Sequence, residues 1–333
     1  MKNLFCSSVE RLSRKKALAV AFLASGMLSG SVVAVGQPSV REVVRVKSVR
    51  AMTPLVEKWI EEYGKVNPDV QIRLADNDIP ASETDIILQI AAPDADSAPD
   101  NQVLFTTGRY AILPIAGADN AVLEAVGKKK LNMKQLKALY FERDIFDEES
   151  GEEEEPDSGQ PAVTVYSGNN EGSVSQPFAA HFGKEQVNLR GKKIAGDDLF
   201  LINAIQKDPS GVSFNNLSYI FDTQSRRLKT GITILPLDLK KEYEEVIRQS
   251  DLDRVIALLE SKTIDLIPVK DISFVMKDDA TSAAQHFLQW VITNGQEYNH
   301  AFGFLTIDAK LREKQQQQLA SKFRKPLLVR HEK

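Results

Sequence analysis

The sequence predicts an α/β protein in which a sheet is covered by helices, and residues 41–72 carry the main observations. The stretch REVVRVKSV alternates charged and β-branched residues, as a strand does. The stretch TPLVEKWIEEYGKV follows with apolar residues at helical spacing, and Thr53 and Pro54 suit its N-cap and first helical position. VQIRL then reads as a second strand. Strand, helix and strand within about 35 residues form a βαβ unit, which implies a parallel sheet with helices on its faces.

Strands and helices alternate along the rest of the chain. Short apolar and β-rich runs predict further strands or turns at residues 84–91, 110–116, 162–167, 211–221, 231–237 and 271–276. Helical spacing predicts helices at residues 132–141, 173–183 and 280–295, a charged helical insertion at 238–262, and a polar helix before the basic C-terminal tail. The predicted fold class is therefore α/β, with sheets flanked by helices.

The N-terminus has the pattern of an export signal. Basic residues are frequent before residue 17, and the apolar run ALAVAFLASGMLSGSVVAV follows them. The run ends in Val32, Val33 and Ala34, which suits signal-peptidase cleavage and predicts a signal peptide over residues 1–34. The alternative is an uncleaved membrane anchor, because about 20 apolar residues can span a bilayer. Several glycines and serines weaken the run, so we expect export with cleavage.

The position of the single cysteine bears on the compartment. Cys6 precedes the apolar run, whereas a lipoprotein needs its acceptor cysteine just after such a run. We therefore expect no lipid anchor. A mature chain without cysteine has neither a disulfide framework nor a thiol nucleophile. The expected localisation is the periplasm.

Charge separates the classes of partner. The formal net charge of −4 provides no basic surface for neutralising phosphates, so we expect no nucleic-acid partner. Nine carboxylates and no basic residue fall within residues 144–157. Such a run repels itself, and we expect an acidic, solvated surface loop over residues 144–160. A cation-binding site there is the alternative.

Motifs for catalysis are absent from the sequence. The four histidines are scattered, and no HExxH, GxSxG, GxxxxGK[ST] or GxGxxG pattern occurs in the required context. We therefore expect no enzyme, no catalytic residue, no metal site and no cofactor.

Small and polar residues gather instead at two strand-to-helix turns, KSVRAMTP and SGNNEGSVS. Turns of this kind present backbone N–H groups and the positive end of a helix dipole, which suit an anion. Ordinary capped helix starts are the alternative interpretation.

Five segments in order resemble a known family, the substrate-binding proteins of phosphate ABC transporters. They lie within residues 43–305 and read PLVEKWIEEYGKVNPDVQI, LNMKQLKALYFERDI, GSVSQPFAAHFG, GVSFNNLSY and AAQHFLQWVITNGQEYNHAFGFL. The resemblance implies a type II periplasmic binding protein (Venus-flytrap) fold, with two domains of mixed sheet flanked by helices and a two-strand hinge. Domain I would comprise residues 43–114 and 273–333, and domain II residues 115–272.

The resemblance also implies a function. It predicts an exported solute-binding protein that binds phosphate or another small oxyanion in the interdomain cleft, for uptake through an ABC transporter permease. The alternative is a scaffold that kept the fold and binds another periplasmic or membrane protein. The expected ligand-binding residues are Ser48, Arg50, Ala51, Asn169, Asn170, Gly172, Ser173 and Ser175.

Most phosphate ligands of the family do not match this sequence. By the resemblance, the family's turn threonine falls at Arg50, and its Gly-Thr pair falls at Ser173 and Val174. Its phosphate-binding arginine falls at Gly168, and its acidic residue falls near Ile90. Arg50 could restore the cation lost at Gly168 with its forked guanidinium. Alternatively the phosphate site is abandoned and Arg50 caps a surface turn, which we favour because each lost charge-assisted hydrogen bond costs about 1.5–3 kcal/mol.

Overall fold

The computed structural model describes residues 42–76, 79–90, 101–120, 123, 130–142, 163–170 and 172–323. The predicted signal peptide, the acidic segment and the basic tail lie outside these residues. The described residues belong to one compact unit. Within the described residues, no helix has the length and apolar character needed to cross a membrane.

Strands from distant parts of the chain form a mixed sheet. Their order is β2-β1-β3-β11-β4-β7-β5-β6, with β10 paired to β4. The strands are β1 (Glu42–Lys47), β2 (Val70–Leu74), β3 (Ile86–Ile90), β4 (Gln102–Gly117), β5 (Thr164–Gly168), β6 (Lys192–Ile194), β7 (Gly211–Asn216), β10 (Ile232–Ile234) and β11 (Val269–Lys277). A separate hairpin joins β8 (Phe221–Asp222) and β9 (Arg227–Leu228). The predicted mixed sheet flanked by helices is confirmed.

The first βαβ unit forms as predicted, since β1 pairs in parallel with both β2 and β3. Its helix is α1 (Thr53–Val66), preceded by a 3₁₀ turn, η1 (Arg50–Met52). The prediction that Thr53 caps the helix was wrong. The 3₁₀ turn runs directly into α1, so Met52 holds the N-cap position and Thr53 is already helical.

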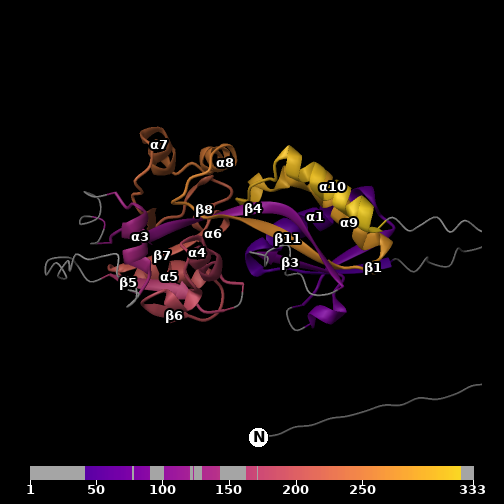
Figure 1. Cartoon of the computed structure of the whole chain (residues 1–333), viewed down its shortest axis with the longest axis horizontal. Coiled ribbons are helices and arrows are strands. Elements are labelled where there is room, and N and C mark those ends of the chain that lie inside the picture. The colour runs from indigo at the N-terminus through magenta and orange to yellow at the C-terminus, as the bar shows by residue number, and fades with distance from the viewer. Residues whose placement is uncertain are drawn as a thin grey trace, which may run out of the picture. The chain divides into compact units, whose positions relative to one another are not determined.

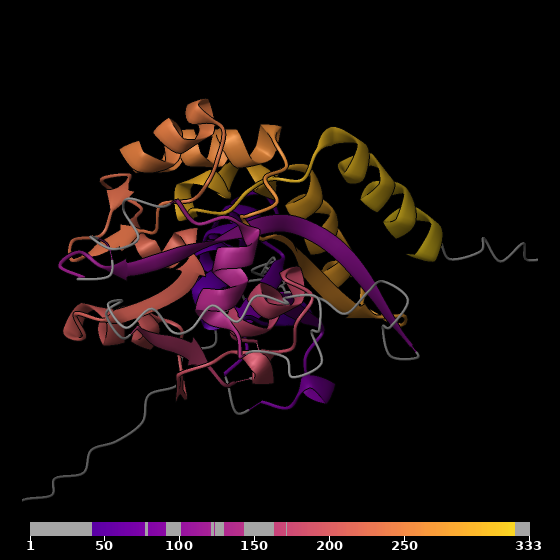
Figure 2. The same cartoon turned by 60° about the vertical axis from the view of Figure 1, so that its left-hand side comes forward.

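One strand is longer than its sequence pattern indicated. β4 begins at Gln102 rather than at Tyr110, and Figure 2 shows it as a long curved purple strand. Its first part pairs antiparallel with β11, from Lys277 opposite Gln102 to Val269 opposite Ala111. Its last part pairs antiparallel with β7. β4 therefore links the strands around β1 to those around β5. A hinge role and the division into two domains stay predictions.

The remaining helices flank these strands (Figure 1). They are α3 (Met133–Tyr140), α4 (Ser175–His181), α5 (Leu199–Lys207), α6 (Leu217–Ile220), α7 (Lys241–Gln249), α8 (Leu252–Ser261), α9 (Ser282–Thr293) and α10 (Ala309–Phe323). Short 3₁₀ turns occupy η2 (Ala81–Glu83), η4 (Gln186–Asn188), η5 (Gly295–Tyr298) and η6 (His300–Phe302). The predicted charged insertion is two helices, α7 and α8, separated by Ser250 in the left-handed conformation.

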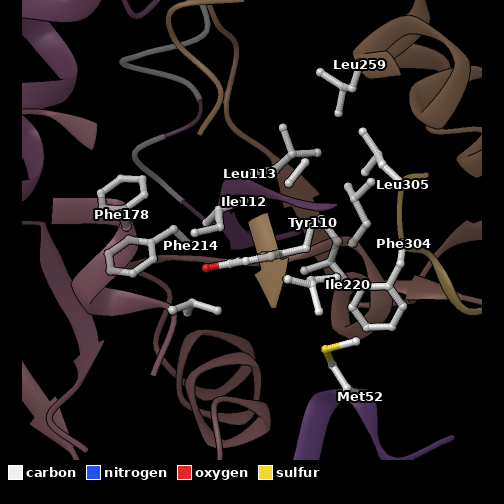
Figure 3. Packing of buried hydrophobic residues seen from close by; sticks show 14 of the residues in the cluster. Met52, Tyr110, Ile112, Leu113, Phe178, Phe214, Ile220, Leu259, Phe304 and Leu305 are labelled. Carbon is white, nitrogen blue, oxygen red and sulfur yellow. The ribbon is translucent and has the colours of Figure 1, made fainter. Parts of the chain in front are cut away.

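Aromatic side chains hold the core on both sides of β4. Phe178 of α4 stacks on Phe214 of β7 with ring centroids 3.7 Å apart, as Figure 3 shows. Tyr140 meets both rings edge-on and donates its hydroxyl to the Ser213 carbonyl at 2.8 Å. Near β11, buried Trp59 donates its indole N–H to the Gly295 carbonyl at 2.8 Å. These contacts fix the strands whose ends carry the candidate site.

Candidate functional site

Three turns and two helices line a cavity of about 460 Å³. Residues 48–51 contribute the turn after β1, and Asn170, Gly172 and Ser173 contribute the turn after β5. Residues 196–198 contribute the turn between β6 and α5, and Phe200 lies in the first turn of α5. Tyr219 of α6 completes the lining. Ligands of open α/β proteins collect at such strand ends, which makes this cavity the candidate site.

The cavity brings together most of the predicted ligand-binding residues. Its lining includes Ser48, Arg50, Ala51, Asn170, Gly172 and Ser173. Asn169 is exposed and donates its backbone N–H to the Ile194 carbonyl, and it does not belong to the lining. Ser175 is buried beneath the turn, where its hydroxyl accepts the Gly168 N–H at 2.8 Å. Ligand binding by these residues stays a prediction.

Arg50 makes an ion pair across the cavity. Its Nε lies 3.3 Å from Oδ2 of Asp197, which belongs to the turn before α5. The Arg50 side chain is 71% exposed, whereas the Asp197 side chain is only 6% exposed. Burial and a hydrogen bond to Asp197 raise the pKa of Tyr219, so this phenol stays neutral beside the carboxylate. Arg50 therefore does more than cap its own turn, because it supplies the cation for a buried carboxylate.

Asp198 uses the donors of the turn before α4. The Ser173 hydroxyl donates to its Oδ1 at 2.6 Å, and the Val174 N–H donates to its Oδ2 at 2.9 Å. Burial raises the pKa of Asp198, and these two hydrogen bonds act against that shift. Ser173 and Val174 are the positions at which the family resemblance placed a Gly-Thr pair. A carboxylate of the chain itself thus occupies their anion-binding groups.

Comparison with known proteins identifies the fold. No family model and no curated protein matches the chain. A structure from Clostridium perfringens, described as a phosphate ABC transporter substrate-binding protein with bound phosphate, aligns with a TM-score of 0.56 at 14% identity, over 80% of this chain and all of that one. An ABC-type phosphate transport receptor from Vibrio cholerae aligns with a TM-score of 0.53 at 9% identity, over 79% of this chain and all of that one. The chain has the fold of a phosphate transporter's substrate-binding protein.

The two phosphate-transport structures confirm, at the level of the fold, the family resemblance read from the sequence. A weaker match is the regulatory domain of Synechocystis CcmR, solved with 2-PG, which aligns with a TM-score of 0.45 at 13% identity, over 75% of this chain and 95% of that one.

Within this substrate-binding-protein fold, Gly168 has no room for the arginine of the family. A Cβ at Gly168 would lie 2.2 Å from the Ser173 hydroxyl and 3.1 Å from Oδ1 of Asp198. Atoms that close must move, so any side chain here disrupts the Ser173–Asp198 contact. Ile90, at the position near which the acidic residue was placed, pairs with Ile272 in the sheet.

The sequence reasoning missed the turn between β6 and α5. Residues 184–210 were assigned no element, and Asp197 and Asp198 were therefore not considered as site residues. A usable signal was present, because GDD directly precedes the apolar run LFLINAI, and acidic residues favour a helix start. Asn170 ties this turn to the predicted one, since its Oδ1 accepts the Gly196 N–H at 3.0 Å.

Metal binding has no support among the described residues. No group of three or more histidine, cysteine, aspartate or glutamate side chains there could hold an ion. His300, one of the four scattered histidines, pairs with Glu260 at 2.8 Å and lies outside the cavity lining.

Proposed function

We propose that the chain is an exported, non-enzymatic solute-binding protein that delivers a small solute to a membrane transporter and does not select inorganic phosphate. The observation that carries this proposal is Asp198, which accepts the Ser173 hydroxyl and the Val174 N–H in the turn before α4. Ser173 and Asp198 line the cavity in which a solute would lie, and Val174 directly follows Ser173.

The charge of the cavity supports the exclusion of phosphate. One arginine and two aspartates line it, so its formal charge is negative before any ligand enters. A phosphate would have to displace Asp198 from its two donors and compete with Asp197 for Arg50. Each charge-assisted hydrogen bond that it failed to form would cost about 1.5–3 kcal/mol. Micromolar affinity corresponds to only about 8 kcal/mol, so a few such losses remove it.

Export and the absence of catalysis rest on separate observations. The basic N-terminus and the apolar run before residue 35 support secretion. The cavity has no histidine and no cysteine in its lining, and both aspartates accept hydrogen bonds from neighbouring groups. This arrangement supports recognition of a solute more than turnover of one.

Calorimetric titration of the mature protein tests the exclusion of phosphate. We expect no isotherm with phosphate or sulfate in the micromolar range. A dissociation constant for phosphate below about 10 μM, near −7 kcal/mol, would restore phosphate uptake as the function. Circular dichroism of the same sample confirms that the protein titrated is folded.

A scaffold role is the second candidate, and the α7–α8 insertion favours it. α7 has exposed or partly exposed side chains along its length and buries only Ile247. Arg226 donates to Asp253 of α8, and Glu260 of α8 accepts hydrogen bonds from His300 and Thr306. These contacts hold α8 against the segment around η6. A protein partner could dock on such a fixed helical surface. Failure of every small solute to change the melting temperature would favour this candidate.

A further inference from the structure

We propose that the cavity binds a small zwitterion, an α-amino acid with an apolar side chain. This inference deepens the proposed function and rests on it. The observation behind it is the Arg50–Asp197 pair, in which opposite charges from different turns meet at the cavity. A ligand that carries both charges can replace this one ion pair with two.

Arg50 offers a site for a carboxylate. Its contact with Asp197 is made through Nε, and no described residue forms a hydrogen bond with its two terminal nitrogens. The side chain is 71% exposed, so these nitrogens are accessible from the cavity and from solvent. A guanidinium with both terminal nitrogens available binds a carboxylate with two parallel hydrogen bonds.

The buried carboxylate of Asp197 requires the ligand to carry a cationic group as well. Its side chain is 6% exposed, and its Oδ1 is held by the Leu199 N–H at 2.8 Å. An anion on the terminal nitrogens of Arg50 would lie beside this buried carboxylate and compete with it for the same guanidinium, which is unfavourable. A ligand ammonium group removes that cost by pairing with Asp197 in turn. Phosphate and simple carboxylates lack such a group.

The remaining wall of the cavity suits an apolar side chain. Phe200 is 45% exposed although it is a large hydrophobic residue, and it lines the cavity beside Tyr219 and Val49. Gly172 adds no side chain to the lining and leaves space there, since even a Cβ would meet only Val49, at 3.8 Å. Binding of an apolar group would cover the Phe200 ring, which is favourable because it removes apolar surface from water.

A matched ligand set tests the requirement for both charges. The set consists of L-leucine, 4-methylpentanoate without the ammonium group, 3-methylbutylamine without the carboxylate, and the corresponding series for L-phenylalanine. Inorganic phosphate, sulfate, glucose and spermidine complete it. Dissociation constants are measured by calorimetry on the mature protein. We expect at least one of the two amino acids to bind, and each of its single-charge analogues to bind about ten- to a hundredfold more weakly, since each lacks one charge-assisted interaction.

Two variants distinguish ligand contact from a structural role. Arg50→Gln should weaken the amino acid and leave the amine unchanged. Asp197→Asn should weaken the amino acid and strengthen the carboxylate analogue, because the anion no longer competes with a buried carboxylate for the guanidinium. Arg73→Gln and Asp69→Asn, at exposed positions of β2 and the turn before it, are the matched controls and should change nothing.

The remaining outcomes overturn the inference in distinguishable ways. Equal binding of an amino acid and its single-charge analogues, or equal weakening of all ligands in both variants, contradicts the zwitterion. Failure of both amino acids with binding of phosphate overturns both the inference and the exclusion of phosphate. If neither amino acid binds but a sugar, a polyamine or sulfate does, the zwitterion proposal is overturned and the proposal of solute binding stands. Failure of all of these solutes overturns both proposals.

Discussion

The Ser173 hydroxyl donates a hydrogen bond of 2.6 Å to Oδ1 of Asp198, and the two residues belong to different turns of the cavity. The Val174 N–H donates to the second oxygen of the same carboxylate at 2.9 Å. Asp198 therefore joins the turn after β5 to the turn after β6. The same contact that stabilises the fold removes two donors from any anion in the cavity.

Replacing Asp198 separates these two effects. In Asp198→Ala we expect the unliganded protein to lose about 1–3 kcal/mol of unfolding free energy, because Ser173 and Val174 lose their acceptor. We also expect millimolar phosphate to raise the melting temperature of this variant more than that of the wild type, because two donors are freed and one negative charge is removed. Asp69→Ala, at an exposed position, is the control. An identical response to phosphate in variant and wild type would show that Asp198 does not exclude the anion.

Gly168 provides a steric test of the same contact. Gly168→Ala places a Cβ 2.2 Å from the Ser173 hydroxyl, so we expect a loss of about 1–3 kcal/mol measured by urea unfolding. The matched control is Gly64→Ala in α1, where a Cβ meets nothing within 4 Å. Because alanine favours helix over glycine, the control should gain about 0.5–1 kcal/mol. Equal unfolding free energies for the two variants would contradict the steric argument.

Elements with a clear period and a marked start could be predicted from the sequence. α3 begins after Asn132, whose side chain accepts the Gln135 N–H as part of a capping box. β4 was read only from Tyr110 because the polar stretch Thr106 to Arg109 interrupts the apolar pattern. In the structure the Thr106 N–H is satisfied by Gln315 of α10, a partner that no local pattern reveals. Strand order has the same limit, since β11 lies between β3 and β4.

Only part of the candidate site could be predicted from the sequence, for a similar reason. Arg50 and Ser173 could be predicted because each lies in a turn between a strand and an apolar helix. Asp198 lies 25 residues beyond its partner Ser173, and Asp197 lies much farther along the chain from its partner Arg50. Both aspartates follow the short strand β6, whose sequence has no clear pattern. Which carboxylate meets which donor is decided by parallel pairing of β5 with β6, a tertiary feature.

Trp59 links α1 to the start of η5. Its indole N–H donates to the Gly295 carbonyl at 2.8 Å, and its side chain is fully buried. In Trp59→Phe we expect a loss of about 2–4 kcal/mol, from the unsatisfied carbonyl and the smaller ring. Trp290→Phe is the matched control because Trp290 is only partly buried, and its cost should be smaller. Urea unfolding followed by circular dichroism measures both, and equal costs would contradict the role assigned to the hydrogen bond.

Glu260 of α8 holds the segment around η6 through a pH-sensitive contact. Its Oε1 accepts from His300 Nε2 at 2.8 Å and from the N–H and hydroxyl of Thr306 at 2.7 Å each. Burial alone would raise the pKa of Glu260, but the hydrogen bonds from His300 and Thr306 lower it to about 2. The hydrogen bond to Glu260 raises the pKa of His300 above its usual 6.5.

The two shifts predict opposite pH limits for this contact. The raised pKa of His300 contributes stability that is fully present below pH 6.5 and is lost as pH rises through the folded-state pKa. The lowered pKa of Glu260 contributes stability that is present above pH 4.5 and is lost as pH falls towards 2. We therefore expect Glu260→Gln to reduce the unfolding free energy most between pH 4.5 and 6.5, the window in which both contributions are complete. Partial exposure of His300 screens the pair, so the histidine contributes less than the hydrogen bonds from Thr306 do.

Urea unfolding measures this difference between wild type and Glu260→Gln at pH values of roughly 3, 5.5 and 9. These values place one point on each side of the window and one inside it. Glu57→Gln, at an exposed position of α1, is the control, and a difference between wild type and Glu260→Gln that does not change with pH would contradict the ionic part of the contact.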